Sequence, residues 1–133
     1  MLGWVGDIEQ QTIDNETFRT VLFTGDHTQL TVMNLRPGED IGLERHDGID
    51  QFLRIERGKA RVELGRSEDA IDETHEVEDD WAVIVPAGIW HNVVNTGDGE
   101  LKLYSLYSPP EHPDGTVHGT KEEAQAAEAA QHG

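Results

Sequence analysis

Short runs of hydrophobic and β-branched residues recur along the middle of the chain, and turn residues separate them. The separators carry the glycine, proline and aspartate that tight turns need, as at Pro37-Gly38 and Asp47-Gly48. Short strands at regular spacing predict an all-β sandwich or barrel. The predicted strands cover residues 20–25, 29–35, 52–58, 59–64, 81–88, 91–97 and 101–107.

The two ends of the chain differ from this pattern. Residues 1–19 are polar and weakly patterned, with a short turn expected around residues 8–15, and we expect them to form an N-terminal arm that serves a partner subunit. Only the C-terminus looks helical, because Thr120 and Glu123 fit a capping box ahead of an alanine-rich segment that offers little to a core. The predicted organisation is an arm at 1–19, a barrel at 20–108, and a proline-rich loop with a short C-terminal helix at 109–133.

Length and composition limit the classes of function. A chain of 133 residues forms one domain, and 27 acidic against 10 basic residues make nucleic acid or an anionic membrane a poor partner. The absence of cysteine excludes disulfides, thiolate metal sites and cysteine nucleophiles. Neither a membrane-spanning run nor a signal peptide is present, so we expect a soluble, cytoplasmic protein.

The acidic residues are scattered along the chain instead of forming one block. Hydrophobic residues still make up 35% of the sequence, which argues against disorder. A folded surface with a net charge of -17 repels itself at low ionic strength, so we interpret the acidity as adaptation to salt. The alternative is an ordinary acidic bacterial protein.

Four side chains form a candidate site. Glu44 and His46 are two residues apart on an extended segment, so they point to the same face. Gln51 opens the next predicted strand, and His91 follows a turn much later in the chain. If the barrel brings these strands together, two imidazoles, a carboxylate and an amide oxygen converge.

The spacing around these residues resembles the two motifs of single-domain cupins. The resemblance covers roughly residues 20–108, and it implies a jelly-roll barrel, also called a double-stranded β-helix. The chain departs from the usual pattern at Glu44, where a histidine is usual, at Gln51, where a glutamate is usual, and at Asp80, where a glycine is usual. The matching positions are Gly38, Glu44, His46, Gln51 and Gly58 in the first motif, and Asp80, Pro86, Gly88, His91 and Asn95 in the second.

The resemblance also implies a metal site. Two histidines with one carboxylate form the facial triad of non-haem Fe(II), and the same donors suit Zn, Mn, Ni or Cu. The implied ligands are Glu44, His46 and His91, with Gln51 as a weak fourth ligand or a hydrogen-bonding group. The alternative is a metal-free pocket in which Glu44 and Gln51 bind ligand hydroxyl groups.

Small cupins like this one are commonly related to mannose-6-phosphate isomerase, so the first functional hypothesis is a metal-dependent isomerase with Glu44 as its catalytic carboxylate. The candidate pocket has no clear phosphate-binding lysine or arginine, which weakens a sugar-phosphate substrate. The alternatives are a non-haem metal dioxygenase and a non-catalytic small-molecule-binding cupin. The family also implies a homodimer with a small-molecule substrate or ligand.

Two further segments lead to expectations. Residues 67–80 are acidic and are predicted to form a solvated hairpin loop, and Arg54 is expected to point outward and pair with surface acids. The proline-rich tail carries His112 and His118, and it is expected either to cap the barrel mouth or pack against a partner, or to act as a rigid connector.

Overall fold

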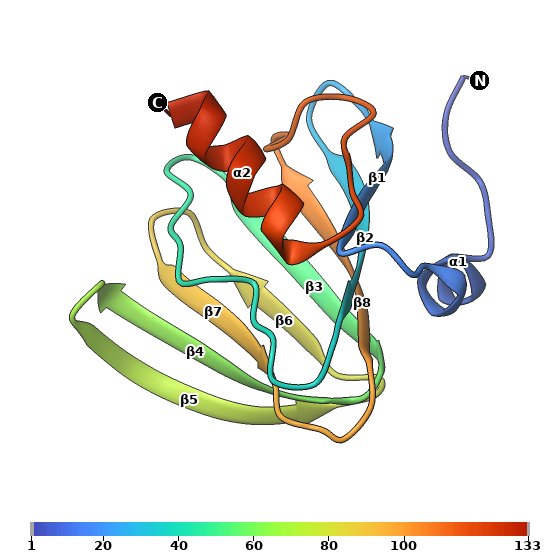
Figure 1. The fold of residues 1–133 in the computed structure, drawn as a ribbon. Helices are drawn as coiled ribbons and strands as arrows, with labels where there is room; N and C mark the ends of the chain where they lie inside the picture. Colours follow the sequence, from blue (N-terminus) through green and yellow to red (C-terminus); the bar gives the residue numbers. More distant parts are fainter. Residues whose placement is uncertain (1, 133) are drawn as a thin grey trace.

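The computed structural model describes residues 2–132, and side chains up to residue 130. Two antiparallel sheets face each other, and two helices lie outside them (Figure 1). The larger sheet has the order β6-β3-β8-β2-β1-β9, and the smaller sheet has the order β5-β4-β7. This is the predicted jelly roll with a short C-terminal helix. Its elements are α1 (Ile8–Asp14), β1 (Arg19–Thr24), β2 (Gln29–Leu35), β3 (Asp50–Arg57), β4 (Lys59–Ser67), β5 (Ala70–Glu78), β6 (Ala82–Val85), β7 (Trp90–Asn95), β8 (Leu101–Ser108), β9 (Val117–His118) and α2 (Lys121–His132).

Seven strands occupy the predicted runs, but β5 corrects one expectation. The acidic stretch at 67–80 is not a loop, because β5 pairs with β4 along most of its length. Its side chains are exposed on both faces except at Val77. A strand exposed on both faces lacks the apolar alternation by which strands are recognised, so the sequence pattern did not predict it.

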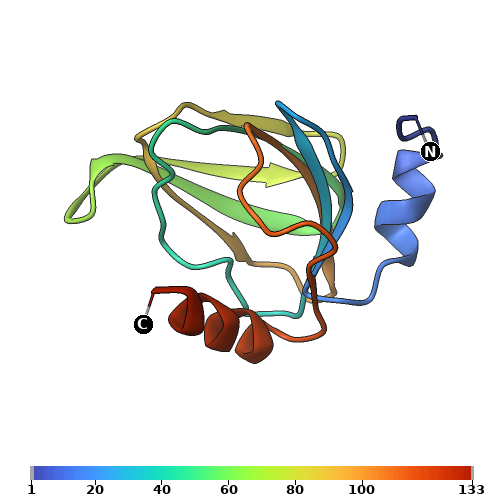
Figure 2. The ribbon, with the colours of Figure 1, turned by 90° about the horizontal axis from the view of Figure 1, so that it is seen from above.

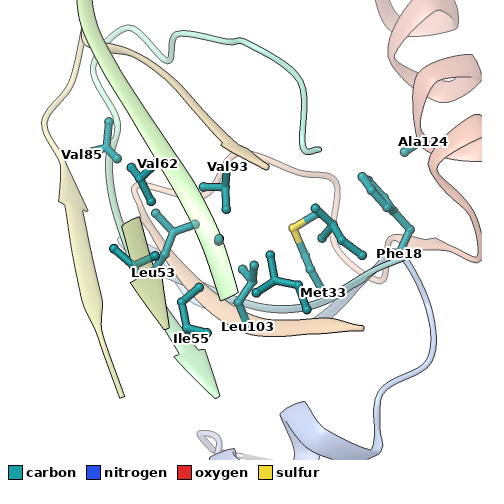
Figure 3. Close-up of a cluster of buried hydrophobic side chains, with 13 residues drawn as sticks. Phe18, Met33, Leu53, Ile55, Val62, Val85, Val93, Leu103 and Ala124 are labelled. Atoms are coloured by element: carbon teal, nitrogen blue, oxygen red, sulfur yellow. The ribbon is translucent and has the colours of Figure 1, made fainter. Parts of the chain in front are cut away.

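The core lies between the two sheets (Figure 3). Met33, Leu103 and Ile55 are cross-strand partners on the inner face of the larger sheet, and each is at most 1% exposed. Val62 and Val93 of the smaller sheet belong to the same buried cluster. Burial of this apolar surface is the main force that holds the sheets together.

The inner face of the larger sheet becomes polar toward one end of the barrel. Gln29, Tyr107 and Gln51 are cross-strand partners in β2, β8 and β3, and all three are buried. They lie four residues from Met33, Leu103 and Ile55 respectively, so they share the same face of the sheet. This polar end is where the candidate site lies.

Helix α1 corrects the expectation that only the C-terminus is helical. The side chain of Asp7 caps it by accepting a hydrogen bond from the backbone N–H of Gln10. The helix packs on the outer side of the larger sheet, next to β8, β3 and β2 (Figure 2). Buried Lys102 of β8 donates from Nζ to the carbonyl oxygen of Asn15 at 2.7 Å. The segment therefore packs against its own chain, and its role toward a partner subunit stays a prediction.

Helix α2 begins with the predicted capping interaction. The backbone N–H of Glu123 donates to Oγ1 of Thr120, and the Glu123 carboxylate accepts from the N–H of Gly119. The expectation that this helix offers little to the core needs one correction, since Ala124 is 3% exposed and faces Phe18 (Figure 3).

No helix in residues 2–132 is both long enough and apolar enough to cross a bilayer.

Candidate metal centre

The segment that follows Pro37-Gly38 runs along β7 as an irregular extra strand. Backbone hydrogen bonds join Ile41 to Val93, and they join Glu44 to His91 in both directions at 3.0 and 2.9 Å. Paired residues of antiparallel backbones place their side chains on the same face. This pairing brings Glu44 directly opposite His91, although 46 residues separate them in the sequence.

Glu44, His46 and His91 form a compact cluster. Oε1 of Glu44 lies 3.2 Å from Nε2 of His46 and 3.7 Å from Nε2 of His91. One donor atom from each residue lies within 4.8 Å of the other two. The side chains of Glu44, His46 and His91 are 24%, 9% and 2% exposed, so the cluster opens to solvent mainly on the Glu44 side.

In each imidazole, the Nδ1 atom points away from the cluster and interacts with a residue outside it. Nδ1 of His91 lies 3.0 Å from the carbonyl oxygen of Ile89, and Nδ1 of His46 lies 3.5 Å from Oε2 of Glu111. With Nδ1 protonated, each Nε2 is a bare acceptor that faces the Glu44 carboxylate. Both Nε2 atoms are buried and make no hydrogen bond to the residues whose side chains are described, 2–130. Converging acceptors of this kind fit a cation, and the donor types suit a divalent transition metal.

The charges in the cluster stabilise an ionised carboxylate. Burial raises the pKa of Glu44, but when His46 and His91 carry a proton on Nε2, their hydrogen bonds and positive charge outweigh this effect and lower the pKa to about 2. Burial lowers the pKa of His46, but the neighbouring Glu44 and Glu111 carboxylates raise it overall. Glu44 is therefore anionic at neutral pH, as a metal ligand must be.

A pocket of about 300 Å³ opens above Glu44 and His46. Its wall is strongly acidic, and the one arginine in it, Arg45, pairs with Asp47 at 3.1 Å. The pocket is lined by Glu44, Arg45, His46, Asp47, Ile49, Glu111, His112 and Glu128. The tail and α2 therefore form part of the wall, as one of the two expectations for the tail proposed.

Gln51 lies beside the cluster on the polar inner row. Its cross-strand partner Tyr107 packs edge-on against His46, with ring centroids 5.9 Å apart. Nε2 of Gln51 lies 3.4 Å from Oγ of Ser105, and its Oε1 atom is buried with no hydrogen-bond partner in the described part of the chain. Ligation by Gln51 stays a prediction.

The two tail histidines lie in different surroundings. His112 packs edge-on against Tyr107, with ring centroids 5.1 Å apart, and it lines the pocket. His118 lies in β9 beside β1, with Nδ1 3.4 Å from Nη1 of buried Arg19. His112 is thus close to the candidate site, whereas His118 belongs to the sheet edge.

Two residues near the site were missed by the sequence analysis. Gln29 is fully buried and hydrogen-bonds the backbone of Glu111 and His112. Glu111 contacts His46. The proline-rich composition of the tail pointed to this segment, but nothing local distinguishes Glu111 from the many other acidic residues.

Contacts and exposed fractions show where Arg54, Trp81 and Trp90 lie. Arg54 pairs with the exposed Asp80 at 2.9 Å, as predicted, and it also pairs at 3.0 Å with Glu56, which is buried. Trp81 is 52% exposed. Trp90 is half-buried, and the guanidinium of Arg45 lies 5.3 Å from its ring centroid.

Comparison with known proteins agrees with the fold and with the spacing of the motifs. The chain is 57% identical over 125 residues to YrkC of Bacillus subtilis (strain 168), covering 94% of this chain and 67% of that protein. It is 37% identical over 115 residues to L612 of Acanthamoeba polyphaga mimivirus, covering 86% of this chain and 70% of that protein. The crystal structure of BH2720 from Bacillus halodurans superposes with a TM-score of 0.91 at 54% identity, covering 92% of this chain and 93% of that one.

The family model described as Cupin domain matches residues 31–107, from β2 to the end of β8. This range contains both motifs and the three donors of the cluster. The family model covers more than half of the chain and agrees with the jelly roll and the motif spacing, so the chain belongs to the cupin family.

Proposed function

We propose that this cupin binds one divalent metal ion through Glu44, His46 and His91 and uses it to act on a small molecule. The observation that supports this most directly is the pair of buried Nε2 atoms that face Oε1 of Glu44 and have no hydrogen-bond partner within the described side chains, up to residue 130. Leaving two buried acceptors unsatisfied costs free energy unless a ligand or ion completes them. A metal ion would satisfy all three donors at once.

A bound divalent ion supplies Lewis-acid polarisation of a substrate oxygen. The backbone carbonyl of Ile89 favours the tautomer of His91 that leaves Nε2 free, and Glu111 lies where it would favour the same tautomer of His46. Oε1 of Glu44 faces the Nε2 atoms of both histidines, so we assign Glu44 to ligation more than to proton transfer.

For an isomerase, the acidic pocket wall favours an uncharged substrate over a phosphorylated one. Glu111 and Glu128 lie on the wall above the cluster, and Asp47 neutralises Arg45. A phosphorylated sugar would meet repulsion from these carboxylates. We therefore propose an isomerase-type reaction on an uncharged hydroxyl- or carbonyl-bearing compound.

A non-haem dioxygenase is the second candidate. The donor set is its supporting observation, because two imidazoles and one carboxylate match the facial triad of Fe(II) oxygenases. Oxygen uptake that depends on added Fe(II) would favour this candidate, whereas oxygen-independent exchange of substrate protons with deuterated solvent would favour the isomerase. Tight ligand binding without either reaction would indicate a non-catalytic binding protein.

The metal site itself is tested first. Protein purified without a histidine tag is reconstituted with Fe(II), Zn, Mn, Ni or Cu and assayed for bound metal, and we expect about one equivalent of at least one ion. Glu44→Ala should lose this binding. Asp47→Ala is the matched control, because it removes a carboxylate from the same pocket wall without touching the donors, and it should retain the metal. Less than about a tenth of an equivalent for every ion would reject the site.

A further inference from the structure

The carboxylate of Glu111 lies next to Nδ1 of His46, as the backbone carbonyl of Ile89 lies next to Nδ1 of His91. Its Oε2 atom lies 3.5 Å from Nδ1 of His46, on the opposite side of the ring from Glu44. On the other imidazole, the Ile89 carbonyl accepts from Nδ1 at 3.0 Å. Groups outside the cluster thus contact both rings: the backbone of Ile89 contacts His91, and the side chain of Glu111 contacts His46.

The tail that carries Glu111 is held by one buried side chain. Oε1 of Gln29 accepts from the backbone N–H groups of Glu111 and His112 at 3.2 and 3.0 Å. Nε2 of Gln29 donates to the carbonyl oxygen of His112 at 2.8 Å. Gln29 is 0% exposed, so these three bonds form away from competing water. Gln29 therefore determines where the backbone of residues 111–112 lies.

We infer that Glu111 is a positioning residue for the metal ligand His46, and that Gln29 holds Glu111 in this role. The inference rests on the proposed metal site. A carboxylate on Nδ1 fixes the tautomer of a ligating histidine, orients its ring and raises its basicity. The proline-rich tail is then part of the metal site, beyond its role as a connector.

The order of the tail and the affinity for the metal are therefore coupled, and each affects the other. If an ordered tail strengthens metal binding, bound metal must stabilise the ordered tail by the same free energy. The coupling passes through contacts present in the structure, from Gln29 to the backbone of Glu111 and from the Glu111 carboxylate to His46.

Zn²⁺ affinity measured by competition with a chelator tests the role of Glu111. We expect Glu111→Gln to bind Zn²⁺ about 10- to 100-fold more weakly than wild type, because the neutral amide no longer raises the basicity of His46. Asp114→Asn removes an exposed carboxylate from the same tail and should leave the affinity unchanged. Equal affinities of Glu111→Gln and wild type would overturn the inference while leaving the metal site intact. A wild type that binds no Zn²⁺, Co²⁺ or other divalent ion would overturn the proposed function and this inference together.

Two further readouts separate positioning from general structural damage. In Co²⁺-loaded protein, the visible absorption bands should shift in Glu111→Gln and stay unchanged in Asp114→Asn, since only the former alters the His46 ligand. Hydrogen exchange at the backbone amides of residues 111 and 112 should slow when Zn²⁺ binds wild type, and should slow less in Glu111→Gln. Unchanged Co²⁺ spectra with metal-independent exchange would contradict the coupling.

Gln29→Met tests the anchor itself. It should weaken Zn²⁺ binding in the same direction as Glu111→Gln, and the double variant should lose little more than either single one, because both act through His46. Losses that add fully would contradict a shared route. If Gln29→Met does not fold, Gln29→Asn tests the same contacts, because its shorter side chain keeps the amide but withdraws it from the backbone of residues 111 and 112.

Discussion

Nδ1 of His91 lies 3.0 Å from the carbonyl oxygen of Ile89, two residues earlier in the chain. A carbonyl oxygen only accepts, so the proton of the neutral imidazole is on Nδ1 and Nε2 is left without one. Ile89 belongs to a turn in which its own N–H donates to the carbonyl of Pro86. The turn before β7 therefore sets the tautomer of a candidate ligand through the backbone alone.

His91→Ala should abolish stoichiometric metal binding, because it removes one of the three donors. The loss of affinity should exceed the roughly 100-fold that removal of an outer partner costs. Metal titration of the purified variant measures this. His75→Ala is the control, since His75 is exposed on β5 away from the cluster, and it should behave as wild type. Unaltered binding by His91→Ala would exclude His91 as a ligand.

His112 should make the protein less stable in acid. Burial, assisted by the positive charge of Arg19, lowers the pKa of His112 from 6.5 to about 3. Between these two pH values the unfolded chain binds more protons at His112 than the folded chain does. The stability that neutral His112 contributes is therefore complete above pH 6.5 and is lost as the pH falls toward 3. At about pH 5 the loss is at most about 2 kcal/mol.

Urea unfolding at neutral pH and at about pH 5 measures this effect. His112→Gln cannot take up the proton, so its free energy of unfolding should fall less than that of wild type on acidification. His27→Gln, at an exposed site, should keep the wild-type slope. The prediction is wrong if the His112 variant and wild type lose equal stability.

Gly58→Ala should destabilise the fold. Gly58 has a φ of 101°, and a Cβ atom there would lie 2.9 Å from the carbonyl oxygen of Glu100. Both the backbone conformation and this close approach disfavour a side chain, so the cost should exceed about 1 kcal/mol. Gly99→Ala is the matched control, because a Cβ there meets no heavy atom within 4 Å. Chemical denaturation that gives equal stabilities would contradict the prediction.

Salt should stabilise the protein. With a net charge of -17, the surface repels itself at low ionic strength, and at about 1 M salt the Debye length falls to about 3 Å. We expect the melting temperature to rise between low salt and molar potassium chloride. A melting temperature that stays constant or falls would favour an ordinary acidic protein over one adapted to salt.

The barrel strands could be predicted from local alternation, whereas His91 joined Glu44 and His46 in the predicted site only through the resemblance to the cupin motifs, because its pairing with Glu44 is long-range. Alternating apolar residues mark strands buried on one face, and Glu44 and His46 share a face through their spacing of two. The missed elements lack such patterns. Strand β5 is exposed on both faces, and α1 has only seven residues, so tertiary packing contributes more to it than local preference.

The sequence by itself determined the strands and the shared face of Glu44 and His46, since side-chain alternation is a property of neighbouring residues, and the spacing of its motifs indicated the family and, through that resemblance, His91 as the third donor. Only the tertiary structure decided how the site is completed. Gln29 and Glu111 are 82 residues apart, and Glu111 meets His46 across 65 residues of chain. Such contacts depend on how β2, the irregular segment and the tail come together at one end of the barrel. No local sequence pattern predicts these contacts, because the free energy that stabilises this arrangement comes from burial of the whole core.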